Sequence, residues 1–285
     1  MRHLLILGFG YSAEAVARLA LAAGWQVSGT SRNPARADAM RAMGVNAVLL
    51  PDGLMAVAAQ ASHILASAAP DAAGDPFLQH YPALGDLKPV WTGYLSTTGV
   101  YGDHAGGWVD EDTPLTPSTT RGVWRVAAEA QWQAQGHSTG TGVHIFRLAG
   151  IYGPGRGPFA KVKDGSARRI IKRGQVFSRI HVDDIAQAVM ASMQAPVAGG
   201  RVYNLCDDDP APPQDVLAYA ADLLGLPPPP EVDFDTADMT PMARSFYAES
   251  KRVSNARMKA ELGVALIHPD YRHGLQALLA GESAS

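Results

Sequence analysis

The chain has 285 residues, and its 24 Lys and Arg against 27 Asp and Glu give a formal net charge of −3. That length suits one large α/β domain, or a domain with a small cap. The hydrophobic share of 47% is ordinary for a globular core. No excess of cations is present to neutralise phosphates, which excludes nucleic acid as the default partner. A long acidic tail is also absent.

A single cysteine, Cys206, excludes an intrachain disulfide and a cysteine-rich metal site. No zinc-type or EF-hand spacing occurs, so no metal is expected. The apolar run 4–7 is shorter than the roughly 7–15 residues of a signal-peptide core. No apolar stretch approaches the roughly 18 residues that span a bilayer. These features predict a cytoplasmic protein without membrane association.

Short apolar runs alternate with Ala-rich helical segments through the first half of the chain. The predicted strands are 3–7, 25–30, 45–50, 63–67, 90–97 and 142–148. The predicted helices are 12–23, 35–43, 52–60 and 120–135. Strands that alternate with helices predict right-handed βαβ units and therefore an α/β fold with a doubly wound parallel sheet.

The second half of the chain is less regular. A loop rich in glycine and proline spans 150–158, and the run 227–230 is four consecutive prolines, which indicates a stiff linker. The predicted helices are 183–193, 213–224, 254–262 and 270–279, and the predicted strand is 201–205.

The strongest local motif is Gly8-Phe9-Gly10-Tyr11-Ser12-Ala13, a G-x-G-x-x-A turn between the first predicted strand and helix. Gly8 permits the tight turn, Gly10 lets the backbone approach a pyrophosphate, and the small Ala13 lets helix and strand pack closely. The helix then begins at Tyr11 and Ser12, whose N–H groups and positive dipole end attract phosphate. The motif predicts a dinucleotide site; a purely structural turn is the alternative.

The end of the second strand bears on which dinucleotide binds. An acidic residue there would bind the ribose 2′-hydroxyl of NAD, but no acid occurs before Asp38. Arg32 is instead placed to face a 2′-phosphate, with Ser31 as a hydrogen-bond donor and Arg36 as a second cation. We predict a preference for NADP(H), with NAD(H) as the alternative.

Five strings, in order along the chain, resemble the extended short-chain dehydrogenase/reductase superfamily, the group of nucleotide-sugar epimerases and dehydratases. They are LILGFGYSA, YLSTTGVYGD, FRLAGIYGPGR, SRIHVDDIAQAV and VYNLCDDDP. The resemblance implies an NAD(P)-binding Rossmann domain, residues 1–153 and 175–206, and a smaller C-terminal substrate domain, residues 154–174 and 207–285. It also implies a cleft between them and a small-molecule substrate, for which a nucleotide sugar is one candidate. A homodimer and a monomer both stay open. Ser67, Ala68 and Ile151 would then lie beside the cofactor.

Catalysis in that superfamily uses a Ser or Thr, which maps to Thr97, and a Tyr-x-x-x-Lys pair on the following helix. When the helix is aligned on Glu129, the Tyr position is Arg121 and the Lys position is Arg125. The chain therefore resembles the atypical branch that lacks this pair. A guanidinium keeps its proton at neutral pH, so Arg121 cannot replace the Tyr as acid and base.

Three consequences follow from the missing pair. Thr97 is left to orient a substrate oxygen, and Arg125 is a candidate to hydrogen-bond the nicotinamide ribose. Substrate contacts are predicted for Arg121, for Arg179 as an anion partner, and for three cleft residues that could instead be packing residues, namely Tyr101, Tyr152 and His181. Two functions stay open: an oxidoreductase or epimerase-like enzyme with a non-standard acid/base, and a catalytically inactive NADP(H)-binding sensor or scaffold.

Overall fold

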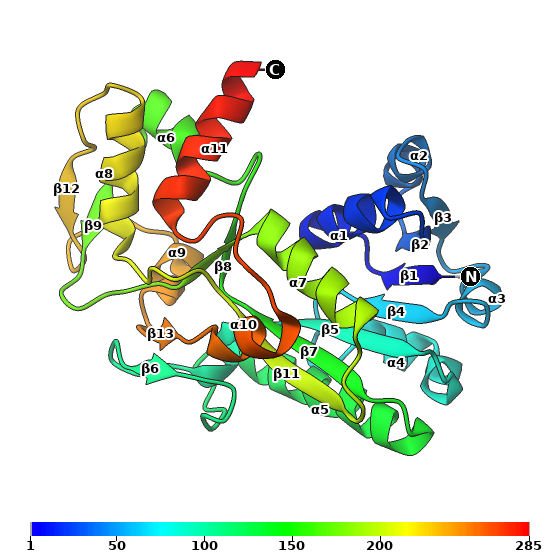
Figure 1. Ribbon diagram of the computed structural model, residues 1–285. Coiled ribbons are helices and arrows are strands. Elements are labelled where there is room, and N and C mark those ends of the chain that lie inside the picture. The colour runs from blue at the N-terminus through cyan, green and yellow to red at the C-terminus, as the bar shows by residue number, and fades with distance from the viewer. Residues whose placement is uncertain (1, 285) are drawn as a thin grey trace.

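The computed structural model describes residues 2–284, and within them seven parallel strands form one central sheet. The strand order is β11-β7-β5-β4-β1-β2-β3 (Figure 1). The chain starts in the middle of the sheet, builds outward to β3, and then crosses to β4 and builds to the other edge. The predicted doubly wound parallel sheet is confirmed. The strand bounds are β1 (His3–Leu7), β2 (Gln26–Ser31), β3 (Asn46–Leu49), β4 (His63–Ala66), β5 (Trp91–Thr97), β7 (Val143–Leu148) and β11 (Gly200–Leu205).

Both faces of the sheet are covered by helices. Alternate residues of β1 show this, because Leu4 and Ile6 join one hydrophobic cluster while Leu5 and Leu7 join another. The first cluster is completed by α1 (Tyr11–Ala22), α2 (Pro34–Ala42), α7 (Val182–Gln194) and α10 (Ala256–Leu262). The second is completed by α3 (Leu54–Ala58), α4 (Pro76–His80), η1 (Pro82–Asp86) and α5 (Thr120–Thr139). No helix among those described is long and apolar enough to cross a membrane.

The spacing of apolar residues determines which face of α1 packs on the sheet, and a glycine determines where the helix ends. Its buried residues Ala13, Val16, Ala17 and Ala20 recur at helical intervals and face the sheet. The helix ends where Gly24 takes a φ of 77°, a left-handed conformation that glycine adopts without strain. This packing fixes the start of α1 directly above the carboxyl end of β1.

A smaller lobe packs beside the carboxyl edge of the sheet (Figure 1). Its own hydrophobic cluster includes Phe159, Ala220 and Leu275. Its elements are α6 (Phe159–Lys163), β9 (Arg169–Ile171), α8 (Pro213–Leu223), β12 (Glu231–Asp233), α9 (Pro241–Phe246) and α11 (Tyr271–Ala284). Two short parallel strands, β8 (Gly150–Tyr152) and β10 (Arg179–His181), pair where the chain passes between the lobes.

Part of the predicted C-terminal domain packs against the main sheet and not in the smaller lobe. Val253, Met258 and Val264 belong to the hydrophobic cluster of the main sheet. The strand β13 (Arg252–Val253) pairs with β6 (Trp108–Val109), which precedes α5. The chain therefore returns from the smaller lobe to the main domain before α11.

Candidate cofactor and substrate site

The carboxyl ends of β1, β2 and β4 open into a pocket of about 1200 Å³. Its walls come from residues 8–10, 30–33, 50–51 and 67–69 and from side chains around α4. The pocket lies where the strand order reverses, between β1 and β4. Ligands of open α/β sheets bind at this switch point, so the pocket is the candidate cofactor site.

The turn after β1 has the geometry that a phosphate-binding loop needs. Gly8 has a φ of 89°, and a Cβ there would lie 2.9 Å from the Ala68 backbone nitrogen, so only glycine fits. The Gly8 N–H donates to Thr30 Oγ1 at 2.8 Å, which ties the turn to β2. A Cβ on Gly10 would meet no atom within 4 Å. The turn therefore leaves open space in front of α1, where a pyrophosphate fits.

The first turn of α1 presents unsatisfied donors to that space. The first helical hydrogen bond runs from the Glu14 N–H to the Gly10 carbonyl. The N–H groups of Tyr11, Ser12 and Ala13 precede it and have no partner within the helix. Ser12 and Ala13 are buried against the sheet, which keeps this end of the helix in place. An anion here gains both hydrogen bonds and the favourable end of the helix dipole.

At the end of β2 the two predicted cations differ. Arg32 is exposed, lines the pocket, and has no carboxylate partner in the part of the chain that the structure describes. Arg36 instead pairs with Glu14 at 2.6 Å and lies over the Phe9 ring. Ser31 Oγ is also engaged, because it donates to the Asn33 carbonyl at 3.0 Å. Arg32 is thus the free cation at this end of the pocket, and Arg36 is held away by an ion pair.

Arg125 joins two strand ends beside the pocket. Its Nη1 donates to the Leu95 carbonyl at 2.7 Å and to the Tyr94 hydroxyl at 3.0 Å. The same nitrogen lies 3.5 Å from the carbonyl of Ala68, a pocket residue. The guanidinium therefore sits at the carboxyl ends of β4 and β5, next to where the nicotinamide half of a dinucleotide would extend.

The remaining predicted residues of β5 and α5, Thr97 and Arg121, are not part of the lining of that pocket. Thr97 is half-buried, and its Oγ1 accepts the Gly99 N–H at 3.1 Å, which caps η2 (Thr98–Tyr101). Arg121 is exposed on the first turn of α5, and its guanidinium lies 6.0 Å from the ring of Phe246 in α9. Arg121 therefore links the main domain to the smaller lobe at the Tyr position of the superfamily motif.

Tyr101 is a packing residue rather than a surface of the cleft. It is fully buried, its hydroxyl donates to Asn204 Oδ1 at 2.7 Å, and Arg147 Nη1 donates to it at 2.9 Å. Arg147 in turn pairs with Glu129 at 2.8 Å, and Ser96 Oγ donates to the same carboxylate at 2.5 Å. Burial raises the pKa of the Tyr101 hydroxyl. This placement gives no support to a substrate contact for Tyr101.

Three more predicted residues lie at the junction of the lobes. Tyr152 is buried, and its hydroxyl donates to the Asp270 carbonyl at 3.3 Å. His181 is buried, and its Nδ1 accepts the Asp183 N–H at 3.2 Å to cap α7. Arg179 donates to the carbonyls of Phe177 and Ala211 at 3.0 and 2.9 Å. These partners hold all three side chains within the protein. Ile151 is half-buried in β8 and is absent from the pocket lining.

One group of three side chains has metal-like spacing. Candidate ligand atoms of His181, Asp183 and His268 lie within 4.8 Å of one another. However, the Nδ1 lone pair of His181 already accepts a backbone N–H. Its Nε2 is buried without a partner among the described residues, whereas a metal-bound histidine normally donates its other N–H. The arrangement therefore fits a capping residue better than a metal ligand.

The predicted cofactor residues divide by position. Gly8, Gly10, Ser31, Arg32, Ser67 and Ala68 line one pocket. Tyr11, Ser12 and Ala13 start the helix above it, and Arg125 and Thr97 continue the same edge toward α5. Sequence reasoning missed Thr30, whose hydroxyl anchors the turn, and Tyr94, which holds Arg125. Thr30 lies in no motif, and only its place near the end of β2 could have indicated it. Tyr94 begins the string YLSTTGVYGD, but its contact with Arg125 depends on how α5 packs against β5.

The fold and this edge of the sheet define a protein with an NAD-binding Rossmann fold. A family model described as the NAD-dependent epimerase/dehydratase family matches residues 87–206. The chain is also 35% identical over 250 residues to Protein YeeZ of Escherichia coli strain K12, a match that covers 80% of this chain and 86% of that protein. The chain belongs to the NAD-dependent epimerase/dehydratase family of extended short-chain dehydrogenases/reductases.

Two solved structures show how far the likeness extends. A functionally unknown conserved protein from Silicibacter pomeroyi DSS has 56% identity and a TM-score of 0.90, over 99% of each chain. MoeE5 in complex with UDP-glucose and NAD has 19% identity and a TM-score of 0.76, over 99% of this chain and all of that one. At the latter identity the likeness shows the fold alone.

Proposed function

We propose that this protein binds NADP(H) in the pocket at the carboxyl ends of β1, β2 and β4 and transfers hydride to or from a small substrate. The observation that carries the proposal is the combination, in one pocket, of the Gly8 to Gly10 turn and Arg32. The turn suits a pyrophosphate, and the exposed guanidinium without a carboxylate partner suits the 2′-phosphate. An NAD-bound neighbour with the same fold supports a dinucleotide at this position.

At the nicotinamide end of the cofactor, Thr97 and Arg125 are the candidate contacts. When bound, the nicotinamide ring would supply or accept the hydride. The proton that the substrate oxygen gains or loses would be exchanged with water, because neither Arg121 nor Arg125 releases its proton at neutral pH. Thr97 Oγ1 would orient a carbonyl or hydroxyl oxygen of the substrate, and Arg125 would hydrogen-bond the nicotinamide ribose through its remaining guanidinium nitrogens. The UDP-glucose bound by MoeE5 makes nucleotide sugars one class of substrate to test.

A second candidate function is cofactor binding without turnover, as in a redox sensor or scaffold. The observation that favours it is the pair of arginines at the Tyr and Lys positions, since a guanidinium keeps its proton at neutral pH. Arg121 is exposed beside Phe246, and Arg125 is engaged by strand-end oxygen atoms. Neither side chain can take the role of a proton donor.

One experiment separates the two functions. The protein is incubated with NADPH or NADP⁺ and a panel of carbonyls, alcohols and nucleotide sugars, and the nicotinamide absorbance band is followed. A change in the band supports the enzyme, whereas tight cofactor binding without turnover on any member supports the sensor. Gly10→Val is the matched control, because its side chain fills the phosphate space without displacing protein atoms near the Cβ. If the wild-type protein binds neither cofactor, both functions are wrong.

A further inference from the structure

The glycine-rich loop after β8 places the side chain of Arg156 beside the start of α1. Gly153 and Arg156 exchange two backbone hydrogen bonds of 3.3 and 2.9 Å, which close a tight turn. The Tyr11 hydroxyl donates to the Pro154 carbonyl at 2.9 Å. The Arg156 guanidinium lies over the Tyr11 ring, 4.5 Å from its centroid. A loop of the lobe junction is thus seated on the first residue of the phosphate-binding helix.

The contact between this loop and α1 depends on a glycine. Gly153 has a φ of 152°, and a Cβ there would lie 2.5 Å from the Tyr11 hydroxyl and 2.7 Å from Val182 Cγ1. Any other residue would push the loop away from α1 or strain its backbone. The close approach of loop and helix therefore fixes where Arg156 stands.

Among the side chains that the structure describes, none neutralises the charge of Arg156. The side chain is exposed, and none of the described carboxylates forms an ion pair with it. Glu14, on the first turn of α1, is already paired with Arg18 at 2.7 Å and with Arg36 at 2.6 Å. The positive end of the α1 dipole and an unpaired guanidinium are therefore neighbours, which favours an anion close to both.

We propose that Arg156 is a cofactor-binding residue that contacts the dinucleotide pyrophosphate while the α1 N–H groups contact it from the helix. This inference rests on the proposed function, because it places Arg156 in the same site. A guanidinium offers paired donors that match phosphate oxygens, and the Tyr11 ring holds its plane in position. The loop links β8 to α6, so the contact also ties the smaller lobe to the bound cofactor.

The test compares ligands that contain the pyrophosphate with a ligand that contains only the 2′-phosphate. Arg156→Ala is expected to weaken the binding of NADPH and NADH alike, by about tenfold, since both contain the pyrophosphate and would lose a charge-assisted hydrogen bond to it. Adenosine 2′-monophosphate, which lacks the pyrophosphate, is expected to bind the variant and the wild type equally. Arg32→Ala is expected to weaken NADPH and adenosine 2′-monophosphate but not NADH.

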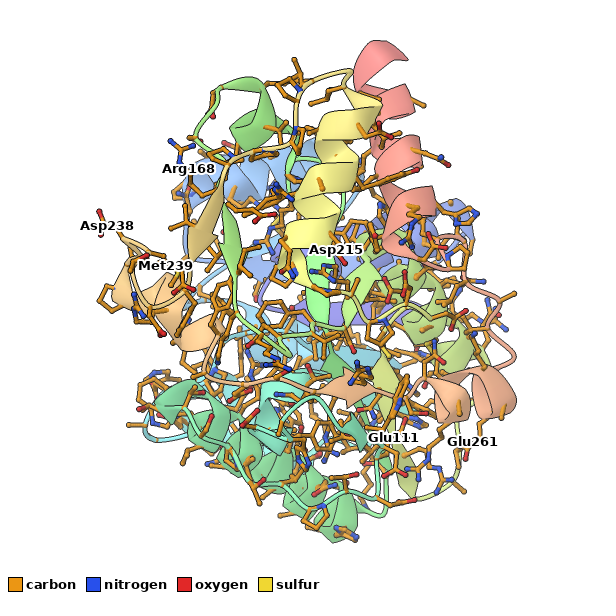
Figure 2. The ribbon with its side chains drawn as sticks, turned by 90° about the vertical axis from the view of Figure 1, so that its left-hand side faces the viewer. Glu111, Arg168, Asp215, Asp238, Met239 and Glu261 are labelled. Carbon is orange, nitrogen blue, oxygen red and sulfur yellow. The ribbon has the colours of Figure 1, made fainter. Side chains whose placement is uncertain are left out.

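Two further variants control for charge and for folding. Arg168→Ala removes the same charge from the outer edge of the smaller lobe (Figure 2) and is expected to leave all affinities unchanged. Tyr11→Leu removes the ring beneath Arg156 and is expected to cost about as much as Arg156→Ala, with no further loss in the double variant. Unfolding midpoints establish that each variant folds.

The outcomes separate the inference from the function on which it rests. Wild-type affinity of Arg156→Ala for NADPH and NADH would overturn the role of Arg156 and leave the cofactor site intact. An equal loss for adenosine 2′-monophosphate would also overturn it, because the effect would not depend on the pyrophosphate. A wild-type protein that binds neither dinucleotide would remove the proposed function and the inference together.

Discussion

Two arginines of one short segment illustrate how a single partner decides a role. Arg32 and Arg36 are four residues apart, and by their charge alone either suits a 2′-phosphate. In the structure Glu14, which lies 22 residues before Arg36 in the chain, pairs with Arg36 at 2.6 Å, while Arg32 stays free at the mouth of the pocket. Under the proposed function, Arg32 rather than Arg36 would therefore contact the 2′-phosphate.

A second residue, Asp207, gives the protein a testable pH dependence. It is buried at the end of β11, and neither carboxylate oxygen has a hydrogen-bond partner in residues 2–284. Burial raises the pKa of this carboxyl to about 8, although nearby Arg179 acts in the opposite direction. The folded state therefore keeps a proton that the unfolded state releases above its ordinary pKa. Between these two pKa values, the contribution of this carboxyl to the stability of the folded state falls as the pH rises.

Asp207→Asn is expected to remove that pH dependence. The free energy of unfolding of the variant minus that of the wild type should rise by about 1.4 kcal/mol per pH unit within that window. Urea unfolding at about pH 5, 6 and 7 measures the difference. Asp215→Asn, at an exposed position on the first turn of α8 (Figure 2), is the control and should show no such trend. A difference that stays constant with pH would contradict the buried neutral carboxyl.

At the scale of elements, α5 is held to the sheet by a buried ion pair. Glu129 on the helix and Arg147 on β7 are 2% and 6% exposed and lie 2.8 Å apart. Glu129→Gln leaves the Arg147 charge buried without its partner, which costs roughly 3–5 kcal/mol. The urea unfolding midpoint should fall accordingly.

The control for this prediction is an exposed pair. Arg41 and Asp38 lie 2.7 Å apart on α2 with half or more of each side chain in solvent. Asp38→Asn should change the free energy of unfolding by less than about 1 kcal/mol, since exposed pairs contribute little. Equal effects at the buried and exposed pairs would contradict the structural role of Glu129.

The first turns of α5 also provide a test of the missing catalytic pair. Arg121→Tyr with Arg125→Lys restores both groups of the superfamily motif on a helix whose position is already fixed by Glu129. The double variant is expected to convert members of the substrate panel at least about tenfold faster than wild type, because a positioned acid/base contributes roughly 10²–10⁴-fold. An unchanged rate would contradict the view that the absent proton donor limits the family reaction.

Elements with strong local signals could be predicted from the sequence. The predicted strand 142–148 and helix 213–224 lie within one residue of β7 and α8. The helix predicted for 120–135 continues to Thr139 and ends at Gly140, which is left-handed. The short pairs of β8 with β10 and β9 with β12 were not predicted, because strands of three residues are defined only by their distant partners.

The dependence on distant partners also separates the site residues that could be predicted from those that could not. Gly8, Gly10 and Arg32 could be assigned because a turn motif and a strand end are local features of the sequence. The burial of Tyr101 and Tyr152 could not, since it depends on Asn204 and Asp270, more than 100 residues away. Segments predicted near the cleft do lie near it, but their side chains turn into the protein.

For the whole molecule, the net charge of −3 is a sum over the chain and does not show where the charges lie. Several arginines lie near the carboxyl edge of the sheet. Arg32, Arg121 and Arg156 have no carboxylate partner among the described side chains, whereas Arg36 and Arg147, near the ends of β2 and β7, are paired with Glu14 and Glu129. Under the proposed function, Arg32 and Arg156 would bind two of the phosphate groups of NADP(H). The smaller lobe lies beside this edge of the sheet (Figure 1).

The most direct measurement is an equilibrium titration of the wild-type protein with NADPH and NADH, followed by nicotinamide fluorescence at one ionic strength. The structure predicts that NADPH binds at least about tenfold more tightly, since Arg32 makes a charge-assisted contact that only the 2′-phosphate offers. Arg32→Ala should bring the two affinities together. Equal affinities in the wild type, or tighter binding of NADH, would contradict the account.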